Sequence, residues 1–382
     1  MNKWKLNTRL NHSVKIIPTS GNPPLLAPIY QSVKFVVSQE LGYGDQFIYT
    51  RLSNPTLKQL EVLLADIQNK EDCIVLSSGI AAITGALFGV LKSGDHVISF
   101  RELYKPARIF VRDMLPRFGV ESTILKLSDL EGLESAIIPG KTKLIHFESP
   151  TNPNLDIADI EAIIKIARKH NVLVSMDSTF AGIHQHTELD IDLMMQSLTK
   201  FGNGHGDVLA GSITGKKILI DRIRHMTVTL GATLDPHAAF LVERGLKTYM
   251  LRFERHTKNA QAVADFLNAH PKVKKVFYPG LKNHPGHDLA KKQMKDMGGM
   301  VSFILDENGQ NADQFAHKLK LIQFAVSLGA TESIICPTHL FFGDDLNSKD
   351  KEEMGINPFS LRLSVGLEDA EDLIEDLKAA LD

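Results

Sequence analysis

Residues 143–177 read KLIHFESPTNPNLDIADIEAIIKIARKHNVLVSMD, and this stretch decides the fold class. The apolar run at 143–147 predicts a buried strand. A helix is expected from Ile157 to His170, because apolar residues recur there every three or four positions. A second apolar run at 172–176 predicts another buried strand, which is followed directly by Asp177. Buried strands joined by a helix are typical of parallel pairing, in which helices cover both faces of the sheet.

The same alternation extends in both directions from this stretch. Apolar runs at 73–76, 96–100 and 120–125 predict further strands, and a helix that begins near Asn54-Pro55 precedes them. A long helical stretch begins at Asp235-Pro236 and runs to about His270. It is followed by apolar runs at 299–305, 321–326 and 360–365 and by an amphipathic helix at 368–381.

We therefore expect an α/β fold with a mainly parallel central sheet sandwiched by helices, plus a smaller α/β C-terminal domain. Residues 1–50 contain Pro18, Pro23, Pro24 and Pro28 and no sustained period, so we interpret them as an extended arm. The large domain is expected to span 51–236 and the C-terminal domain 237–382.

Composition excludes several classes of protein. The chain has 43 Lys and Arg against 45 Asp and Glu, a net charge of −2, so it carries no electrostatic footprint for nucleic acid or an anionic membrane. Its two cysteines, Cys73 and Cys336, fit a reducing cytoplasm. The uncharged window 73–91 approaches the length of a membrane span, but Ser77-Ser78-Gly79 interrupts it, so we interpret it as a strand, a turn and a helix. Residues 1–13 lack the apolar core of a secretory signal.

Four clusters of small or polar residues follow predicted strands, where open parallel sheets bind their ligands. They are Ser77-Ser78-Gly79, the loop 148–153, Asp177, and Ser197-Leu198-Thr199-Lys200. Small residues before a helix let backbone N–H groups hold an anion. A carboxylate after a buried strand needs a cation or a donor, and a buried lysine becomes nucleophilic when its pKa falls. Each cluster also has an ordinary interpretation: a strand-to-helix turn, a proline turn, a helix cap, or a solvated lysine before a glycine-rich loop.

Taken jointly, the clusters indicate a site for pyridoxal phosphate. Lys200 would form the Schiff base, and Asp177 would keep the ring nitrogen protonated so that the ring can accept carbanion charge. Hydroxyl groups and a helix N-terminus would hold the phosphate. His184 and His186 have no third ligand nearby in the sequence, so no metal site is expected.

Several longer motifs now carry a specific resemblance. They are Tyr49-Thr50-Arg51 with Asn54-Pro55-Thr56, Ser77-Ser78-Gly79-Ile80-Ala81-Ala82, Pro150-Thr151-Asn152-Pro153, Asp177 with Thr179-Phe180, Ser197-Leu198-Thr199-Lys200, Arg244-Gly245-Leu246-Lys247-Thr248, and Arg362-Leu363-Ser364-Val365-Gly366. With them the chain resembles, over nearly its whole length, the pyridoxal-phosphate enzymes of cysteine and methionine metabolism. These are the cystathionine lyases and synthases and methionine γ-lyase. The resemblance implies the fold of type I pyridoxal-phosphate enzymes.

The resemblance also implies a role for each matched residue. Lys200 would carry the cofactor and move protons, Asp177 would pair with the pyridine nitrogen, and Tyr104 would stack on the ring. The phosphate would be bound by Gly79, Ile80, Ser197 and Thr199, while Asn152 would contact the side of the ring that bears the hydroxyl. Arg362 with Ser327 would hold the α-carboxylate of the substrate.

The resemblance further implies that the site is shared between chains. Tyr49 and Arg51 would reach the phosphate of a neighbouring subunit, so a monomer should be inactive. Pairs of such dimers would form a homotetramer.

Three features depart from the family pattern. Tyr104 is followed by Lys105-Pro106-Ala107 instead of glycine and a small residue, and the stretch 332–339 is shorter than usual. Val326 stands where relatives that grip the distal amino group of cystathionine tend to have Glu. Lys105 either faces the distal end of the substrate or is an ordinary solvated lysine, and both readings stay open here.

We expect a cytoplasmic lyase that breaks a carbon–sulfur bond of a small sulfur amino acid, first of all cystathionine, by β- or γ-elimination. The alternatives within the family are methionine γ-lyase and a cystathionine γ-synthase that joins cysteine to an activated homoserine. A different class is a paralogue that binds pyridoxal phosphate without turnover or serves as a structural partner.

Overall fold

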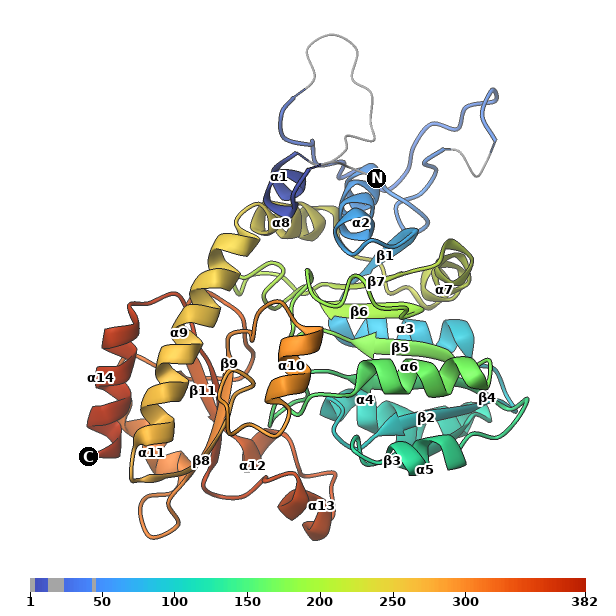
Figure 1. Cartoon of the computed structure of the whole chain (residues 1–382). Coiled ribbons are helices and arrows are strands. Elements are labelled where there is room, and N and C mark those ends of the chain that lie inside the picture. Colours follow the sequence, from blue (N-terminus) through green and yellow to red (C-terminus); the bar gives the residue numbers. More distant parts are fainter. Residues whose placement is uncertain (1–3, 13–23, 43–45) are drawn as a thin grey trace.

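The computed structural model describes residues 4–12, 24–42 and 46–382, and its largest element is a seven-stranded sheet (Figure 1). The strand order is β1-β7-β6-β5-β4-β2-β3. Neighbouring strands are parallel except at β7, which runs antiparallel to β1 and β6. The strands are β1 (Asp72–Leu76), β2 (His96–Phe100), β3 (Glu121–Leu125), β4 (Thr142–Glu148), β5 (Leu173–Asp177), β6 (Leu193–Ser197) and β7 (Gly211–Gly215). The five strands predicted for this part of the chain are therefore confirmed, each within one residue at either end.

Helices cover both faces of this sheet. Leu144 and Ile145 are consecutive in β4 and so point to opposite faces. Ile145 packs in a cluster with Ile163 of α6, whereas Leu144 packs in another with Leu87 of α3. The α-helices of this part are α2 (Pro55–Ile67), α3 (Gly79–Val90), α4 (Lys105–Ile109), α5 (Leu130–Ser135), α6 (Ile160–Lys169) and α7 (Lys217–Leu230), and α4 is followed by the π-helix η2 (Phe110–Met114) and the 3₁₀ helix η3 (Leu115–Phe118). The sandwiched α/β architecture expected from the sequence is confirmed.

The helix predicted from Ile157 begins three residues later, because its capping residue lies later. The Asp159 side chain accepts a hydrogen bond from the Ala162 backbone N–H, so α6 begins at Ile160. The uncharged window 73–91 forms β1, a turn and α3, as predicted. Of the helices in the described ranges, none is both long and apolar enough to cross a membrane.

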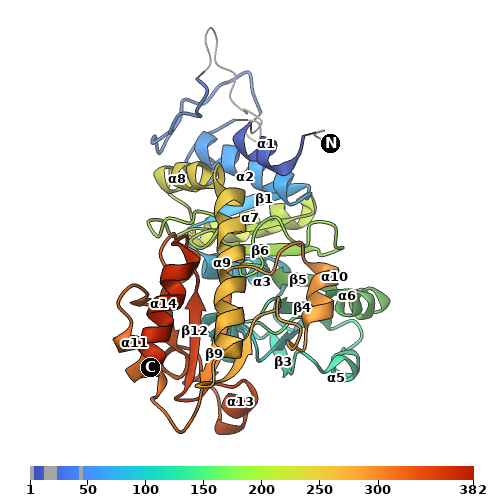
Figure 2. The same ribbon diagram turned by 60° about the vertical axis from the view of Figure 1, so that its left-hand side comes forward.

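A second, five-stranded sheet forms the smaller part of the molecule, in the order β10-β11-β12-β9-β8. Its pairs are antiparallel except for β10 with β11. Its strands are β8 (Val273–Phe277), β9 (Met300–Leu305), β10 (Gln323–Phe324), β11 (Ile334–Pro337) and β12 (Ser360–Ser364). Its helices are α10 (His287–Gln293), α11 (Ala312–Lys318), α12 (Thr338–Phe341), α13 (Ser348–Glu353) and α14 (Ala370–Leu381). Figure 2 shows the long helix α9 (Tyr249–Ala269) running from α8 (Pro236–Leu246) down to this sheet.

Two expectations for the C-terminal part are wrong in detail. The single helix expected from Asp235 to His270 is divided into α8 and α9. Arg252 donates to the Gly245 carbonyl at 2.8 Å and so satisfies a carbonyl in the last turn of α8. The strand expected at 321–326 shrinks to β10, because the backbone N–H groups of Leu321 and Ile322 donate to the Asp376 carboxylate instead of to a neighbouring strand.

The predicted apolar runs also omit β6 and β7. β7 has the sequence GSITG, and glycine at both ends lowers its strand signal. It forms nevertheless, because β1 and β6 hold it on both sides.

The described part of the N-terminal segment contains one short helix. Residues Leu6–Asn11 form helix α1, and Leu10 is buried against the helices of the large part. Residues 24–42 contain no helix, and Leu25 and Val36 are almost fully exposed. Pro18 and Pro23 of the predicted arm lie outside the described residues.

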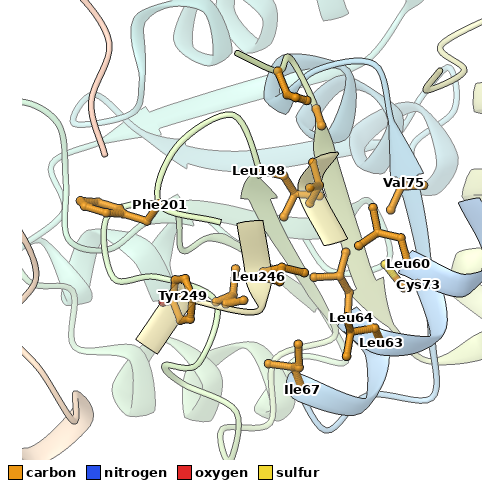
Figure 3. Close-up of a cluster of buried hydrophobic side chains, with 14 of the residues drawn as sticks. Leu60, Leu63, Leu64, Ile67, Cys73, Val75, Leu198, Phe201, Leu246 and Tyr249 are labelled. Carbon is orange, nitrogen blue, oxygen red and sulfur yellow. The ribbon is translucent and has the colours of Figure 1, made fainter. Parts of the chain in front are cut away.

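One apolar cluster joins the two ends of the large part of the chain (Figure 3). Leu60 and Leu64 of α2 meet Leu246 of α8, and Leu198 and Phe201 belong to the same cluster. Leu198 and Phe201 are each at most 1% exposed. Because these two residues flank Thr199-Lys200, the core fixes the segment that carries the candidate lysine.

Candidate active site

The carboxyl ends of the central strands bring the predicted residues together. In the sheet register Glu148, the last residue of β4, lies opposite Asp177, the last residue of β5, and Asp177 lies opposite Met195 of β6. β6 ends two residues later at Ser197, and Lys200 follows in the turn. All four predicted clusters therefore meet at one edge of the sheet, because Gly79, after β1, lies directly against Ser197 at the end of β6.

Lys200 is held with its amine among polar groups. Its Nζ donates to the Ser327 Oγ at 2.7 Å. Burial, helped by the nearby positive charge of Arg362, lowers the pKa of Lys200 to about 8. An amine with a pKa of about 8 is about one-tenth neutral at pH 7 and half neutral at pH 8, and the neutral amine can act as a nucleophile or a base.

Asp177 is a buried carboxylate that no cation among the described residues neutralises. Its Oδ1 accepts hydrogen bonds from the Thr179 backbone N–H at 2.9 Å and from the Thr179 hydroxyl at 2.6 Å. Burial raises the pKa of Asp177, and the two bonds from Thr179 oppose the rise. A positively charged partner at this position would satisfy the carboxylate.

The turn before α3 and the end of β6 form a narrow cradle. A Cβ added at Gly79 would lie 2.6 Å from the Cβ of Ser197, so a side chain at position 79 would close the space. The Ser78 side chain caps α3 by accepting from the Ala81 N–H, and the first N–H groups of a helix have no partner within it. The cradle therefore offers N–H groups and the Ser197 hydroxyl to an anion.

Thr199 lies beside this cradle, but its hydroxyl is engaged elsewhere. Its Oγ1 donates to the Ala210 carbonyl at 3.2 Å and accepts from the Ala210 N–H at 3.0 Å. The Thr199 hydroxyl has one proton, so it could donate to a phosphate only by giving up its hydrogen bond to the Ala210 carbonyl.

Arg362 reaches the site from β12 of the second sheet. Its Nη1 donates to the Asn152 Oδ1 at 3.0 Å and its Nη2 to the Ser327 carbonyl at 2.8 Å. Its Nε is buried and has no hydrogen-bond partner in the described part of the chain. A buried guanidinium with a free donor suits a carboxylate ligand.

Ser327 connects the lysine to the arginine. Its φ of 103° is a conformation that residues other than glycine rarely adopt. In this conformation its hydroxyl accepts from Lys200 while its carbonyl accepts from Arg362. Backbone strain of this kind clusters at ligand sites.

Tyr104 stands at the N-terminus of α4 with its side chain 40% exposed. Its backbone N–H donates to the Glu148 Oε2 at 2.8 Å. Burial raises the pKa of Glu148 well above its usual value, and the charge of Asp177 adds to the rise. Sequence reasoning assigned Glu148 no role. The available signal was that a carboxylate follows the apolar run 143–147, as Asp177 follows the run at 172–176.

Lys105 has a partner of its own. Its Nζ lies 2.5 Å from the Asp344 Oδ1. The Lys105 side chain is 25% exposed and that of Asp344 is 63% exposed. Val326 is exposed beside Ser327. Neither of the two readings left open for Lys105 included this ion pair.

Tyr49 and Arg51 are not brought to Lys200 within one chain. The Arg51 guanidinium lies 5.5 Å from the centre of the Tyr49 ring and donates to the Val228 carbonyl at 3.4 Å. Arg51 lines a cavity of about 360 Å³ between α2, β1 and α7, and Lys200 is not among its lining residues.

The site fits pyridoxal phosphate on three observations. An amine of lowered pKa lies near a buried carboxylate that lacks a cation, and the backbone at Gly79 lies so close to Ser197 that a side chain at position 79 would clash. Within the described ranges, no three His, Cys, Asp or Glu side chains gather in a way that could hold a metal ion.

Comparison with known proteins agrees with this arrangement. Residues 20–382 match the model of the family described as Cys/Met metabolism PLP-dependent enzyme. An L-methionine gamma-lyase from Fusobacterium nucleatum subsp. nucleatum is 42% identical over 394 aligned positions, covering 100% of this chain and 99% of the relative.

Solved structures agree as well. The crystal structure of a cystathionine gamma-lyase from Lactobacillus plantarum, complexed with L-serine, superposes with a TM-score of 0.92 at 34% identity, over 99% of this chain and 98% of the other. A structure from Campylobacter jejuni that contains N'-pyridoxyl-lysine-5'-monophosphate superposes with a TM-score of 0.91 at 31% identity, over 99% of this chain and 100% of the other. With a family model matched over nearly its whole length, this chain belongs to the pyridoxal-phosphate-dependent enzymes of cysteine and methionine metabolism.

Proposed function

We propose that the chain is a carbon–sulfur lyase that eliminates a thiol from the γ-carbon of a thioether L-amino acid, with methionine preferred to cystathionine. The observation that carries the proposal is the placement of Lys200. Its amine has a pKa of about 8, contacts Ser327 and lies near the carboxylate-binding candidate Arg362. One base is thus held beside the group that would bind the α-carboxylate of an amino acid.

Pyridoxal phosphate, when bound, withdraws electron density from the substrate α-carbon and so makes its proton acidic. Lys200 would remove that proton and, once protonated, could return it at a neighbouring atom of the substrate. Its lowered pKa suits both directions of transfer near neutral pH.

Arg362 would fix the substrate by its carboxylate. Its unpartnered Nε and its Nη groups form a planar fork that matches two carboxylate oxygens. The Asn152 and Ser327 oxygens already hold the fork in place. Asp177 would keep the cofactor ring nitrogen protonated, and Tyr104 would stack over the ring and assist the departing thiol.

The preference for methionine follows from the distal end of the site. Val326 offers no charge there, and the charge of Lys105 is compensated by Asp344 at 2.5 Å. The methylthio group of methionine is uncharged, so no charge has to be desolvated when it enters such a region. The distal carboxylate of cystathionine would be desolvated there and would have to compete with Asp344 for Lys105. Cystathionine stays the second candidate, because the Lys105–Asp344 pair is partly exposed and can exchange partners.

We also propose that the active enzyme is a homotetramer built from dimers that share sites. Tyr49 and Arg51 carry polar groups but contact nothing at Lys200 in their own chain. The nearly fully exposed Leu25 and Val36 are apolar groups that a second copy of the chain would cover. The proposed division is an arm at 1–50, a cofactor domain at 51–236 and a substrate domain at 237–382. The two buried, unpaired cysteines support a reducing compartment such as the cytoplasm.

The pH dependence of cofactor attachment tests Lys200. Covalent attachment of pyridoxal phosphate to cofactor-free protein should rise with pH and reach half its maximum near pH 8, because only the neutral amine attacks. Borohydride trapping followed by peptide mapping should place the label on Lys200, and Lys200→Ala should take up none. Lys70 is the internal control, since burial also lowers its pKa but its amine donates to the carbonyls of Leu189 and Ile191. Labelling of Lys70 in preference to Lys200 would contradict the assignment.

Replacing Asp177 tests its electrostatic role. Asp177→Asn should keep the fold and lower kcat by about 100-fold or more, because the charge opposite the ring nitrogen is lost. Asp192→Asn is the matched control. Asp192, which directly precedes β6, is also a buried carboxylate, but it pairs with Arg168 at 2.8 Å. The Asp192→Asn replacement should lower the melting temperature and leave kcat nearly unchanged. Equal kcat values for the two variants would contradict the proposed role.

The substrate preference can be tested by identifying the reaction products and by removing each partner of the Lys105–Asp344 ion pair. The enzyme should convert L-methionine to methanethiol, 2-oxobutyrate and ammonia, with a higher kcat/KM than for cystathionine. Asp344→Ala should lower KM for cystathionine by about 2- to 5-fold and leave methionine unchanged, because it frees the charge of Lys105. Lys105→Ala should change neither. Pyruvate as the main product, or consumption of acylhomoserine with cysteine and no lyase activity, would overturn the proposal of a γ-lyase.

Mixed oligomers test the shared site. Arg51→Ala chains and Lys200→Ala chains should each be inactive alone. Hybrid dimers should regain activity, since one of their two sites combines the intact Lys200 of one chain with the intact Arg51 of the other. Native mass spectrometry would verify that hybrids form. Inactive hybrids would mean that Arg51 acts within its own chain.

A further inference from the structure

A group of ion pairs joins the segment after β2 to the loop and helix at 341–353. The segment supplies the cations, and the loop with α13 supplies the anions. The pairs are Arg101 with Asp350 at 2.7 Å and with Glu353 at 2.5 Å, Lys105 with Asp344 at 2.5 Å, Arg108 with Asp345 at 2.7 Å, and Arg112 with Asp345 at 3.2 Å. Because Tyr104 lies within this segment, these contacts bear on the position of its ring.

Arg108 differs from the other cations of the group. Its side chain is 2% exposed and that of Asp345 is 7% exposed. Its Nε donates to the Asp345 Oδ2 at 2.9 Å and its Nη2 to the Asp345 Oδ1 at 2.7 Å, a two-pronged contact. Burial acts to raise the pKa of Asp345, but the bonds and charge of Arg108 hold it below the usual range. The pair is therefore a buried, charged contact in one fixed geometry.

The remaining donors of Arg108 hold the backbone that leads to Tyr104. Its Nη1 donates to the carbonyls of Arg101 at 2.8 Å and Leu103 at 2.7 Å. With the Phe342 carbonyl at 3.0 Å, all five N–H donors of the guanidinium are used. Arg108 thus fixes the backbone just before Tyr104, while Glu148 accepts the N–H of Tyr104 itself.

The contact between Arg108 and Phe342 leads on to Arg362, the candidate for binding the substrate carboxylate. The Phe342 carbonyl accepts a hydrogen bond from Arg108, and the centre of the Phe342 ring lies 4.5 Å from the guanidinium carbon of Arg362. At this distance the guanidinium and the ring make a cation–π interaction. A continuous set of contacts therefore runs from Arg362 through Phe342 and Arg108 to Tyr104.

We propose that Arg108 and Asp345 form a positioning pair that sets where the Tyr104 ring lies relative to Arg362. This inference rests on the proposed function, in which Tyr104 covers the cofactor ring and Arg362 holds the substrate. The pair fixes the distance between the residue that binds the carboxylate and the residue that assists the departing thiol. Neither Arg108 nor Asp345 touches the reacting atoms.

The test compares Arg108→Lys with Arg112→Lys in the cofactor-loaded enzyme. Lys at 108 keeps the charge but has at most three donors on one atom, so the carbonyls of Arg101 and Leu103 lose their fixed partner. Arg112→Lys is the matched control, because Arg112 contacts the same Asp345 but no carbonyl near Tyr104. The measurements are the visible circular dichroism of the bound cofactor, which reports its surroundings without turnover, and kcat and KM for L-methionine.

We expect Arg108→Lys to change the circular dichroism band and to lower kcat by up to about 100-fold, as when an oriented group moves by about 1 Å, with a smaller change in KM. Arg112→Lys should change neither. If Arg108→Lys does not fold, Asp345→Asn replaces it, since it keeps the shape and one acceptor, and the same changes are expected.

Two outcomes separate failure of this inference from failure of the proposed function. If wild-type enzyme turns over methionine and the variants at 108 and 345 lose only melting temperature, like the control, the pair is merely structural and the inference is overturned. If wild-type enzyme turns over no sulfur amino acid but the band still changes in Arg108→Lys alone, the positioning pair stands and the proposed function fails.

Discussion

The burial of the Lys200 amine is the constraint on which the rest of the site depends. A desolvated ammonium is unfavourable, so the side chain shifts toward its neutral form and its pKa falls to about 8. Apolar neighbours enforce this burial, because Leu198 and Phe201 insert into the core on either side of the turn. Removing their packing would let the turn move toward water, and the pKa of Lys200 would then return toward that of an ordinary lysine. The activity of the amine is thus stabilised by residues that never meet a ligand.

The sequence predicts those parts of the site that depend on local order. Asp177 directly follows an apolar run that predicts a strand, so its position at a strand end can be predicted from the sequence. Lys200 is identified instead by the motif Ser197-Leu198-Thr199-Lys200, because the predicted apolar runs omit β6. The contact of Arg362 with Asn152 joins residues 210 positions apart, and no period or motif specifies it. The same holds for Arg108 with Asp345, which are 237 positions apart. The Lys105 side chain pairs with Asp344, which is distant in the sequence, and the residues next to Lys105 do not indicate whether its amine pairs with a carboxylate or faces solvent.

Three of the misjudged elements share one physical reason. At the break between α8 and α9, Arg252 of α9 donates to the Gly245 carbonyl, and β7 pairs with a strand on either side. Leu321 and Ile322 leave the predicted strand because Asp376 offers their N–H groups a stronger acceptor. In each case a tertiary partner satisfied backbone groups that local propensity would have assigned elsewhere.

The antiparallel direction of β7 has a consequence for how this family member can vary. In a wholly parallel sheet the segment after β6 would lead into a helix, but here it returns through β7, and the ladder pairs Ser197 with Gly211 at the base of the loop. The segment that bears the lysine is therefore closed by its own hairpin. The residues proposed to face the far end of a substrate, Val326, Lys105 and Asp344, lie outside this hairpin. Lys105 and Asp344 pair with each other, whereas the Lys200 amine is held by Ser327, so changes at positions 105 and 344 can accumulate while the reactive group stays fixed.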